Sequence, residues 1–373
     1  MQQTRIPVAE PLIGDKELEY VTAAVKSSWI SSQSKYVTEF EEKFSKYCGA
    51  KHGAATSSGT TALHLALVIL NIGEGDEVIM PSFTMIATAN AITYTGAKPI
   101  LVDSELNTWN IDVDKIEEKI TDKTKAIMVV HTYGHPVDMD PLLEIAQDHG
   151  LYVIEDAAES HGADYKGKRA GNLGDIACFS FYANKIITTG EGGMLVTNNE
   201  KYAEKARWLR GLAFGRFGKH FYHEALGFNY RMSGLQAALG VAQLEQIDKF
   251  ISIHRSNARL YNSLLSELGD KVTLHPEAPW AKNVYWMYSI LIQEEFGISR
   301  DNLMRKLELD GIETRTFFYP IHVQPIYAQQ YTGELFLVAD ELSRKGMNLP
   351  SGNSLTADGV AYVCECIKKH AKR

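Results

Sequence analysis

Two apolar strand patterns are joined by a lysine and a glycine-rich turn in the stretch Phe179-Ser180-Phe181-Tyr182-Ala183-Asn184-Lys185-Ile186-Ile187-Thr188-Thr189-Gly190-Glu191-Gly192-Gly193-Met194. Glycines at such a turn permit positive φ angles and a close approach of the backbone. A lysine in an enclosed, partly apolar place can have a lowered pKa, which makes its neutral amine available for Schiff-base formation. A solvated loop lysine is the ordinary alternative, but it does not explain the surrounding arrangement.

The strand on each side of this turn belongs to a longer alternation of strands and helices. The patterns predict strands over Glu77 to Met80, Pro99 to Val102, Ala126 to His131, Tyr152 to Glu155, Ile176 to Ser180 and Met194 to Thr197. Apolar residues between them recur at helical spacing, as in Leu63, Ala66, Leu67 and Leu70, and in Leu142, Ile145 and Ala146. This order is typical of an α/β domain, in which helices cover both faces of a parallel sheet.

The C-terminal third has a different pattern. A helical pattern begins near Gly234 and continues towards Leu265, and such a long helix commonly bridges domains. Beyond it we expect a strand at Tyr288, a helix over Arg300 to Leu309 and a strand over Ile312 to Phe318, which together make a compact α+β unit. The sequence therefore predicts a large domain over residues 1–250 and a small one over 251–373.

Composition excludes several classes of protein. The 373 residues are 45% hydrophobic and 23% charged, with a net charge of -8, so no basic field favours nucleic acid. Four cysteines are too few for a disulfide framework, and the lone Cys364-Glu365-Cys366 lacks the second pair of a zinc site, so we expect no metal. No secretory leader and no apolar run of about 18 residues is present, which predicts a cytoplasmic protein without a membrane span.

Two further segments bear on the chemistry. Thr56-Ser57-Ser58-Gly59-Thr60-Thr61 directly precedes a helical pattern, where free backbone N–H groups can bind a phosphate, although an ordinary N-cap is the simpler interpretation. Val153-Ile154-Glu155-Asp156-Ala157-Ala158-Glu159 is an apolar strand that ends in carboxylates, at the edge where α/β sheets bind ligands. Asp156 opposite a protonated pyridine nitrogen would keep that ring cationic. A phosphate-binding helix start, a strand-end carboxylate and a lysine are the three contacts that pyridoxal phosphate (PLP) requires.

The sequence resembles the DegT/DnrJ/EryC1/StrS sugar aminotransferases, which are fold type I (aspartate-aminotransferase-like) PLP enzymes. The resemblance implies a large α/β domain with a mixed, mostly parallel sheet between helices, and a smaller C-terminal α+β domain. The likeness spans nearly the whole chain and rests on Trp29-Ile30-Ser31-Ser32, Ser58-Gly59-Thr60-Thr61-Ala62-Leu63-His64, Gly75-Asp76-Glu77-Val78, Glu155-Asp156-Ala157-Ala158-Glu159, Gly190-Glu191-Gly192-Gly193 and Asn348-Leu349-Pro350. Further matches are Asp138-Met139-Asp140-Pro141, Gly227-Phe228-Asn229-Tyr230-Arg231-Met232 and Phe318-Tyr319-Pro320-Ile321-His322.

The resemblance implies a role for each matching residue. Lys185 would carry the cofactor as a Schiff base and then move the proton, while Asp156 pairs with the pyridine nitrogen and Glu159 lies near the ring hydroxyl. The phosphate would be held by Ser58, Gly59, Thr60 and Ser180, and by Asn229 from a neighbouring subunit. The active site would then lie at a homodimer interface, with Trp29, Arg231 and His322 on the sugar-nucleotide side.

The sequence departs from the family pattern at three places. Relatives commonly carry an aromatic residue that stacks on the cofactor at the position of Met85, and methionine gives a looser, polarizable contact there. Close relatives usually have glycine in place of Ser34, and a Pro-Val pair in place of Thr316-Phe317. The shape of the substrate loop and the details of substrate binding are therefore expected to differ.

The activity implied is a ping-pong transamination. L-Glutamate would convert PLP to pyridoxamine phosphate, and the amine would pass to the C4 keto group of a nucleotide-linked 4-keto-6-deoxy sugar, with GDP-4-keto-6-deoxy-D-mannose favoured. A dTDP- or UDP-linked sugar, C3 chemistry and the downstream pathway stay open. Lys185 argues against a PLP-dependent dehydratase, in which histidine replaces the lysine. A regulatory PLP-binding protein would normally add a DNA-binding module, and an oxidoreductase would need a Gly-x-Gly-x-x-Gly turn.

Overall fold

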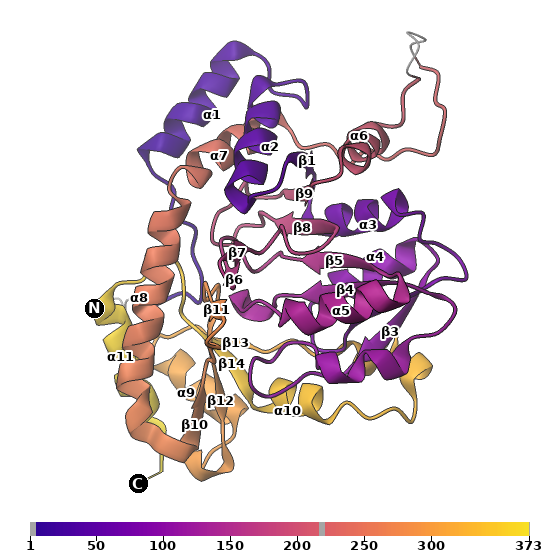
Figure 1. Ribbon diagram of the computed structural model, residues 1–373. Helices are drawn as coiled ribbons and strands as arrows, with labels where there is room; N and C mark the ends of the chain where they lie inside the picture. Colours follow the sequence, from indigo (N-terminus) through magenta and orange to yellow (C-terminus); the bar gives the residue numbers. More distant parts are fainter. Residues whose placement is uncertain (1–4, 216–220, 373) are drawn as a thin grey trace.

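A seven-stranded sheet in the order β1-β9-β8-β5-β4-β2-β3 forms the centre of the protein (Figure 1). The computed structural model describes residues 5–215 and 221–372. The strands are β1 His52–Thr56, β2 Glu77–Pro81, β3 Lys98–Val102, β4 Thr124–Val130, β5 Tyr152–Asp156, β8 Ile176–Ser180 and β9 Gly193–Thr197. β8, β5, β4, β2 and β3 are parallel, whereas β9 is antiparallel to β8 and β1. The predicted mixed, mostly parallel sheet is confirmed.

All six predicted strands of this sheet are present, and β1 is the strand that the sequence did not indicate. Its centre, Gly53-Ala54-Ala55, consists of small residues without the β-branched and aromatic side chains that mark strands. The reason for the small residues is packing, because a Cβ on Gly53 would lie 2.7 Å from the carbonyl oxygen of Glu41 in the adjacent helix α2 (Lys35–Cys48). The close packing of β1 against α2 requires small residues, and these residues do not form a recognisable strand pattern in the sequence.

Both faces of the sheet are buried, as parallel strands require. Met80 and Met128 point into one hydrophobic cluster, and their neighbours Ile79 and Ile127 point into another. The first cluster includes residues of α3 and α4, and the second includes residues of α5. The helices of this region are α1 Asp15–Ser27, α2 Lys35–Cys48, α3 Gly59–Ile69, α4 Ala87–Tyr94, α5 Met139–His149, α6 Glu200–Leu209 and α7 Gly234–Leu244.

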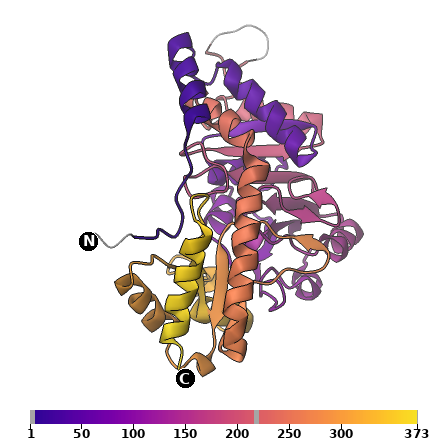
Figure 2. The ribbon, with the colours of Figure 1, turned by 90° about the vertical axis from the view of Figure 1, so that its left-hand side faces the viewer.

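A second, antiparallel sheet has the order β10-β12-β14-β13. Its strands are β10 Val272–Leu274, β12 Tyr288–Ile292, β13 Arg315–Thr316 and β14 Gly346–Leu349, and its helices are α8 Ile247–Leu265, α9 Arg300–Leu309, α10 Leu337–Lys345 and α11 Ala357–His370. α8 and α11 lie side by side (Figure 2). A small sheet of β6 Asp164–Tyr165, β7 Lys168–Arg169 and β11 Ala281–Lys282 connects residues of both parts.

The single long helix predicted from Gly234 to Leu265 is wrong, because the structure has two helices, α7 and α8, with a break at Gln246. Gln246 has φ -114° and ψ 1°, outside the helical region. The side chains of Gln243 and Gln246 both donate to Oε1 of the buried Glu17 in α1, each at 2.7 Å. The hydrogen bonds of Gln243 and Gln246 to α1 thus accompany the break between α7 and α8.

α8 contributes to both hydrophobic cores. Ile247 and Phe250 lie in the cluster of the large sheet, whereas Tyr261 and Leu265 lie in a separate cluster around the second sheet. The helix therefore connects the two parts and belongs to both. The domain boundary at residue 250 stays a prediction, because the cluster of the large sheet also contains Val284, Trp286 and Phe317.

The strand predicted over Ile312 to Phe318 is too long, because β13 contains only Arg315–Thr316. Ile312 instead forms a bridge with Ile6 of the N-terminal segment, so the start of the predicted strand pairs outside the sheet. At the other end the N–H of Phe318 donates to the hydroxyl of Tyr133 at 3.3 Å and so leaves the sheet. Among the described helices, none has both the length and the apolar character to cross a bilayer.

Candidate active site

A cavity of about 430 Å³ lies at the carboxyl ends of the parallel strands. Val130, Asp156 and Ser180, the last residues of β4, β5 and β8, all line it. Eight of the twelve predicted site residues line this cavity, namely Ser58, Gly59, Thr60, Met85, Asp156, Glu159, Ser180 and Lys185. The topology thus brings together residues that are more than 120 positions apart in the chain.

One end of the cavity is formed by the start of α3. Ser58 is the N-cap, and its hydroxyl accepts a hydrogen bond from the N–H of Thr61 at 3.2 Å. The first-turn N–H groups of Gly59 and Thr60 have no acceptor within the helix and carry its positive dipole end. A Cβ on Gly59 would lie 2.8 Å from the Cβ of Ser180, so only glycine lets α3 start against β8. Backbone donors and two hydroxyls therefore converge where a phosphate group fits.

Asp156 points into the middle of the cavity and is 5% exposed. Its Oδ2 accepts from the hydroxyl of Thr88 at 2.8 Å, and its Oδ1 accepts from the N–H of Ala158 at 3.2 Å. Burial raises the pKa of Asp156, and these two donors oppose the rise only in part. A cationic ring nitrogen facing the free lone pairs would stabilise the carboxylate, so the residue fits a pyridinium partner.

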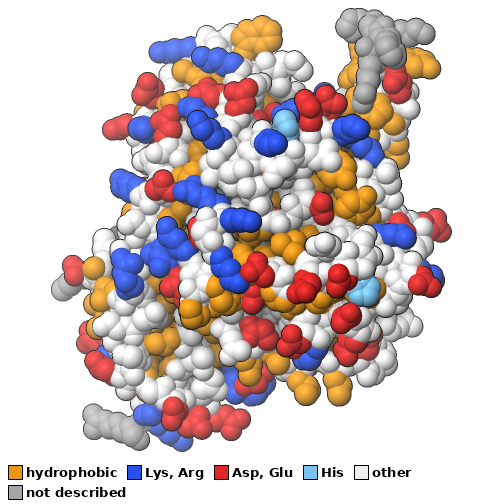
Figure 3. Space-filling model, in the orientation of Figure 1, with side chains coloured by type: hydrophobic (Ala, Val, Ile, Leu, Met, Phe, Trp, Pro, Cys, Tyr) orange, Lys and Arg blue, Asp and Glu red, His pale blue; other side chains and the backbone are white. Residues whose placement is uncertain are grey.

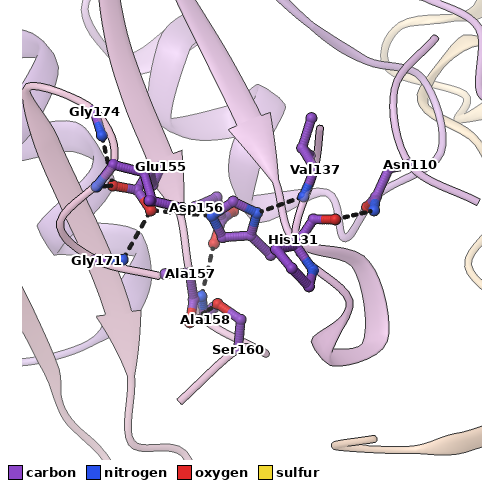
Figure 4. Close-up of polar contacts among 12 residues, drawn as sticks. Asn110, His131, Val137, Glu155, Asp156, Ala157, Ala158, Ser160, Gly171 and Gly174 are labelled. Carbon is purple, nitrogen blue, oxygen red and sulfur yellow. Dashed lines mark hydrogen bonds and ion pairs between the residues drawn. The ribbon is translucent and has the colours of Figure 1, made fainter. Parts of the chain in front are cut away.

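The neighbouring Glu155 points to the other side of the strand and forms a buried polar network (Figure 4). Nε2 of His131 donates to Glu155 at 3.0 Å, while Nδ1 accepts from the N–H of Val137 at 3.1 Å. Burial alone would raise the pKa of Glu155, but His131 and the backbone amides of Gly171 and Gly174 lower it below its ordinary value. The network fixes the end of β5, and with it the direction of Asp156.

Lys185 follows β8 and lies inside the cavity, where its side chain is 11% exposed. Burial lowers its pKa, the carboxylates of Glu159 and Asp156 oppose this effect, and the Arg315 guanidinium adds to it. Nζ lies 4.0 Å from Oε1 of Glu159. Burial raises the pKa of Glu159 to about 7, and Lys185 and the N–H of Tyr133 limit that rise. The site thus holds a lysine that is more easily deprotonated than usual.

These residues fit PLP. The start of α3 suits its phosphate, Asp156 suits its ring nitrogen, and Lys185 suits its aldehyde carbon. When bound, this cofactor supplies an electron sink for a carbanion next to nitrogen. Met85 also lines the cavity, and its sulfur accepts from the N–H of Ala87 at 3.0 Å.

Four predicted residues do not line this cavity. Trp29 is 62% exposed in the segment between α1 and α2. Asn229 is exposed, and its Oδ1 accepts from Nε of Arg231 at 3.1 Å. His322 is held by Ser82 at 2.7 Å and Asp340 at 3.1 Å and stacks on Phe336. Their proposed roles stay predictions.

The structure adds cavity residues that the sequence did not indicate. Trp286 and Arg315 come from the second sheet and its flanking segments, and their local sequence carries no recognisable signal. Phe318 also lines the cavity, and it begins the segment Phe318-Tyr319-Pro320-Ile321-His322 that matched the family pattern. Thr88 bonds directly to Asp156, and Asn184 lines the wall next to Lys185. Asn184 lies in the same stretch as Lys185, so its position could have been inferred from the sequence.

Comparisons with known proteins bear on the family and on the overall fold. The DegT/DnrJ/EryC1/StrS aminotransferase family matches residues 11–368. GDP-perosamine synthase of Caulobacter vibrioides is 47% identical over 359 residues, which are 96% of each chain. GDP-perosamine synthase of Escherichia coli O157:H7 is 47% identical over 366 residues, which are 98% of each chain. The solved structure of S. venezuelae DesV is 33% identical, covers 99% of each chain and superimposes with a TM-score of 0.92.

Proposed function

Because this chain belongs to the DegT/DnrJ/EryC1/StrS aminotransferase family and is a PLP-dependent sugar aminotransferase, we propose that it makes GDP-perosamine. The proposed acceptor is the C4 keto group of GDP-4-keto-6-deoxy-D-mannose, and the proposed donor is L-glutamate. The observation that carries this proposal is the 47% identity, over nearly the whole chain, to two relatives named GDP-perosamine synthase.

The reaction exchanges an amino group and a keto oxygen between the α-carbon of glutamate and C4 of the sugar. The α-carbon of glutamate loses its amino group and a hydrogen and gains the keto oxygen, which gives 2-oxoglutarate. C4 of the sugar loses that oxygen and gains the amino group and a hydrogen. No external oxidant or reductant is consumed. What the protein must supply is an acceptor and donor of one proton in each half of the cycle.

Lys185 is the proposed proton carrier. Its pKa is lowered by burial, so more of it is neutral near pH 7 than of an exposed lysine, and a neutral amine can accept a proton. Asp156 would hold the cofactor ring nitrogen protonated, and Glu159 would lie at the ring hydroxyl. Ser58, Gly59, Thr60 and Ser180 would hold the phosphate end, next to the dipole of α3.

We also propose a homodimer. The chain on both sides of residues 216–220 extends from the end of α6 (Figure 1). Apolar side chains are exposed on this extension (Figure 3). Phe221 and Leu226 are each 85% exposed and Tyr222 is 54% exposed. Asn229 lies at the base of this extension, where a bridge joins it to Gly211. Such exposed apolar side chains favour burial against a second copy of the chain. In that dimer, Asn229 of one subunit would reach the cofactor phosphate bound by the other subunit.

We place the enzyme in the cytoplasm, in the synthesis of O-antigen or another polysaccharide. The four free cysteines of the described residues support a reducing compartment. A relative from Bacillus subtilis that is 37% identical is named spore coat polysaccharide biosynthesis protein SpsC, which supports the polysaccharide role.

An absorbance experiment tests the function. PLP-loaded protein should show a visible band that L-glutamate bleaches, and GDP-4-keto-6-deoxy-D-mannose should restore the band in a single turnover. The dTDP- and UDP-linked 4-keto-6-deoxy sugars are the control acceptors. If one of them restored the band and the GDP-linked sugar did not, the proposed GDP-linked substrate would be wrong. The Lys185→Ala variant should bind PLP without this band and lose turnover, and an active variant would contradict the role of Lys185.

A further inference from the structure

Trp286 enters the cavity from the segment before β12 and faces Lys185. Nζ of Lys185 lies 3.8 Å from the centroid of the Trp286 ring. The indole N–H donates to the carbonyl oxygen of Asn184 at 2.7 Å. One side chain, 5% exposed, therefore contacts the amine of the lysine and also fixes the backbone next to it.

The backbone that presents this ring is held in an unusual conformation. Tyr285 has a φ of 51°, a left-handed value that a bulky residue rarely adopts. Gly134 has a φ of 103°, and a Cβ there would lie 3.0 Å from the backbone nitrogen of Trp286. Such conformations persist only where the surroundings over-determine them, and they cluster at functional sites. The backbone of Trp286 is thus held by Tyr285, which precedes it in the chain, and by Gly134, which packs against it.

The amine of Lys185 has few other restraints. Across residues 5–215 and 221–372 no hydrogen bond to Nζ is found, and the nearest charge partner, Glu159, lies at 4.0 Å. The four-carbon stem of a lysine is flexible, so a free amine would sample many rotamers. An ammonium over an indole face is attracted by the ring quadrupole, most strongly where water is excluded. Trp286 is therefore placed to restrain the amine whenever it is free.

We propose that Trp286 is a positioning residue for Lys185, an inference that rests on the proposed function. While the amine of Lys185 is free during turnover, the ring face holds it inside the cavity, at the place where it accepts and returns the proton. The indole N–H keeps Asn184, and so the start of the lysine segment, in register. The ring favours the protonated nitrogen, and therefore also raises the pKa at Nζ relative to an aliphatic neighbour.

Two variants separate the ring face from the N–H group. Trp286→Leu removes both and should lower kcat about tenfold with little change in the KM for glutamate. It should also lower by about one unit the pH midpoint of the rate at which the visible band forms when PLP is added to cofactor-free protein, because the free amine loses its cation–π partner. Trp286→Phe keeps a ring face and should titrate within roughly 0.3 units of the original protein.

Trp280→Phe is the matched control, since Trp280 packs against His135 and Tyr165 and lines a different cavity. The Trp280→Phe variant should change neither kcat nor the pH midpoint of band formation. The proposal is overturned if Trp286→Leu keeps the original kcat and the original midpoint of band formation, or if Trp286→Phe shifts the midpoint as far as leucine does. A failure of the original protein to show a glutamate-bleached band would instead overturn the proposed function, so the two failures are distinguishable.

Discussion

Two charged side chains shift the pKa of the Lys185 amine in opposite directions. Arg315 lowers the pKa of Lys185, and Glu159 raises it. Since the rate depends on neutral Lys185, the acid limb of the kcat profile should move to higher pH in Arg315→Gln and to lower pH in Glu159→Gln. At 4.0 Å the effect of Glu159 should be about one to two pH units. Profiles of both variants measured together provide the check, and shifts of the same sign would contradict this electrostatic picture.

The residues that could be predicted from the sequence are those with a local signal. Asp156 ends an apolar strand, and Lys185 stands between a strand and a glycine turn, so the chemistry of each is visible within a few positions. Trp286 and Arg315 lie about 100 or more positions from Lys185, in segments whose pattern is only that of strands. Their place in the cavity is a product of tertiary packing, which one sequence does not reveal.

At the scale of elements, the contact between α3 and β8 determines the phosphate end of the cavity. A Cβ at position 59 would lie 2.8 Å from the Cβ of Ser180, closer than packing allows. Gly59→Ala should push the start of α3 away from β8 and weaken PLP binding about tenfold, because the helix N–H groups would move off the phosphate. Titration of the cofactor-free protein with PLP, followed by absorbance, measures this loss.

Gly73→Ala is the control for that experiment. Its Cβ would meet the carbonyl oxygen of Thr95 at 3.5 Å, an ordinary contact, so its PLP affinity should be unchanged. Equal affinity of the Gly59→Ala variant and the original protein would show that the helix start tolerates the displacement.

Elements were predictable where local pattern and tertiary contact agree. The helix α9 has the bounds expected from its sequence, and the strands of the parallel core were found from apolar runs alone. The break before α8 depends on a partner in α1, far away in the chain, and the small residues of β1 depend on packing against the preceding helix α2. These contacts override local propensity, and for that reason the sequence pattern failed there.

At the scale of the whole molecule, buried neutral histidines link stability to pH. Burial lowers the pKa of His135 to about 4 and that of His161 to about 3. Burial lowers the pKa of His254 and His275 as well. Below the unfolded value of about 6.5 the unfolded chain binds protons that the folded chain does not, so the free energy of unfolding falls as pH falls. Glu159 acts in the opposite direction, because its raised pKa lets the folded state keep a proton.

A single variant isolates one of these groups from the rest. His161 is packed among the rings of Phe44, Phe179 and Phe181, where leucine can replace it without a titrating group. Between pH 7.5 and pH 5 the original protein should lose about 2 kcal/mol more stability than His161→Leu, because only the original protein must keep this imidazole neutral. Urea unfolding of both proteins at the two pH values, each saturated with PLP, measures the difference. If both lost the same stability, His161 would be protonated in the folded state, and the aromatic cluster beneath Ser180 and Lys185 would admit a charge.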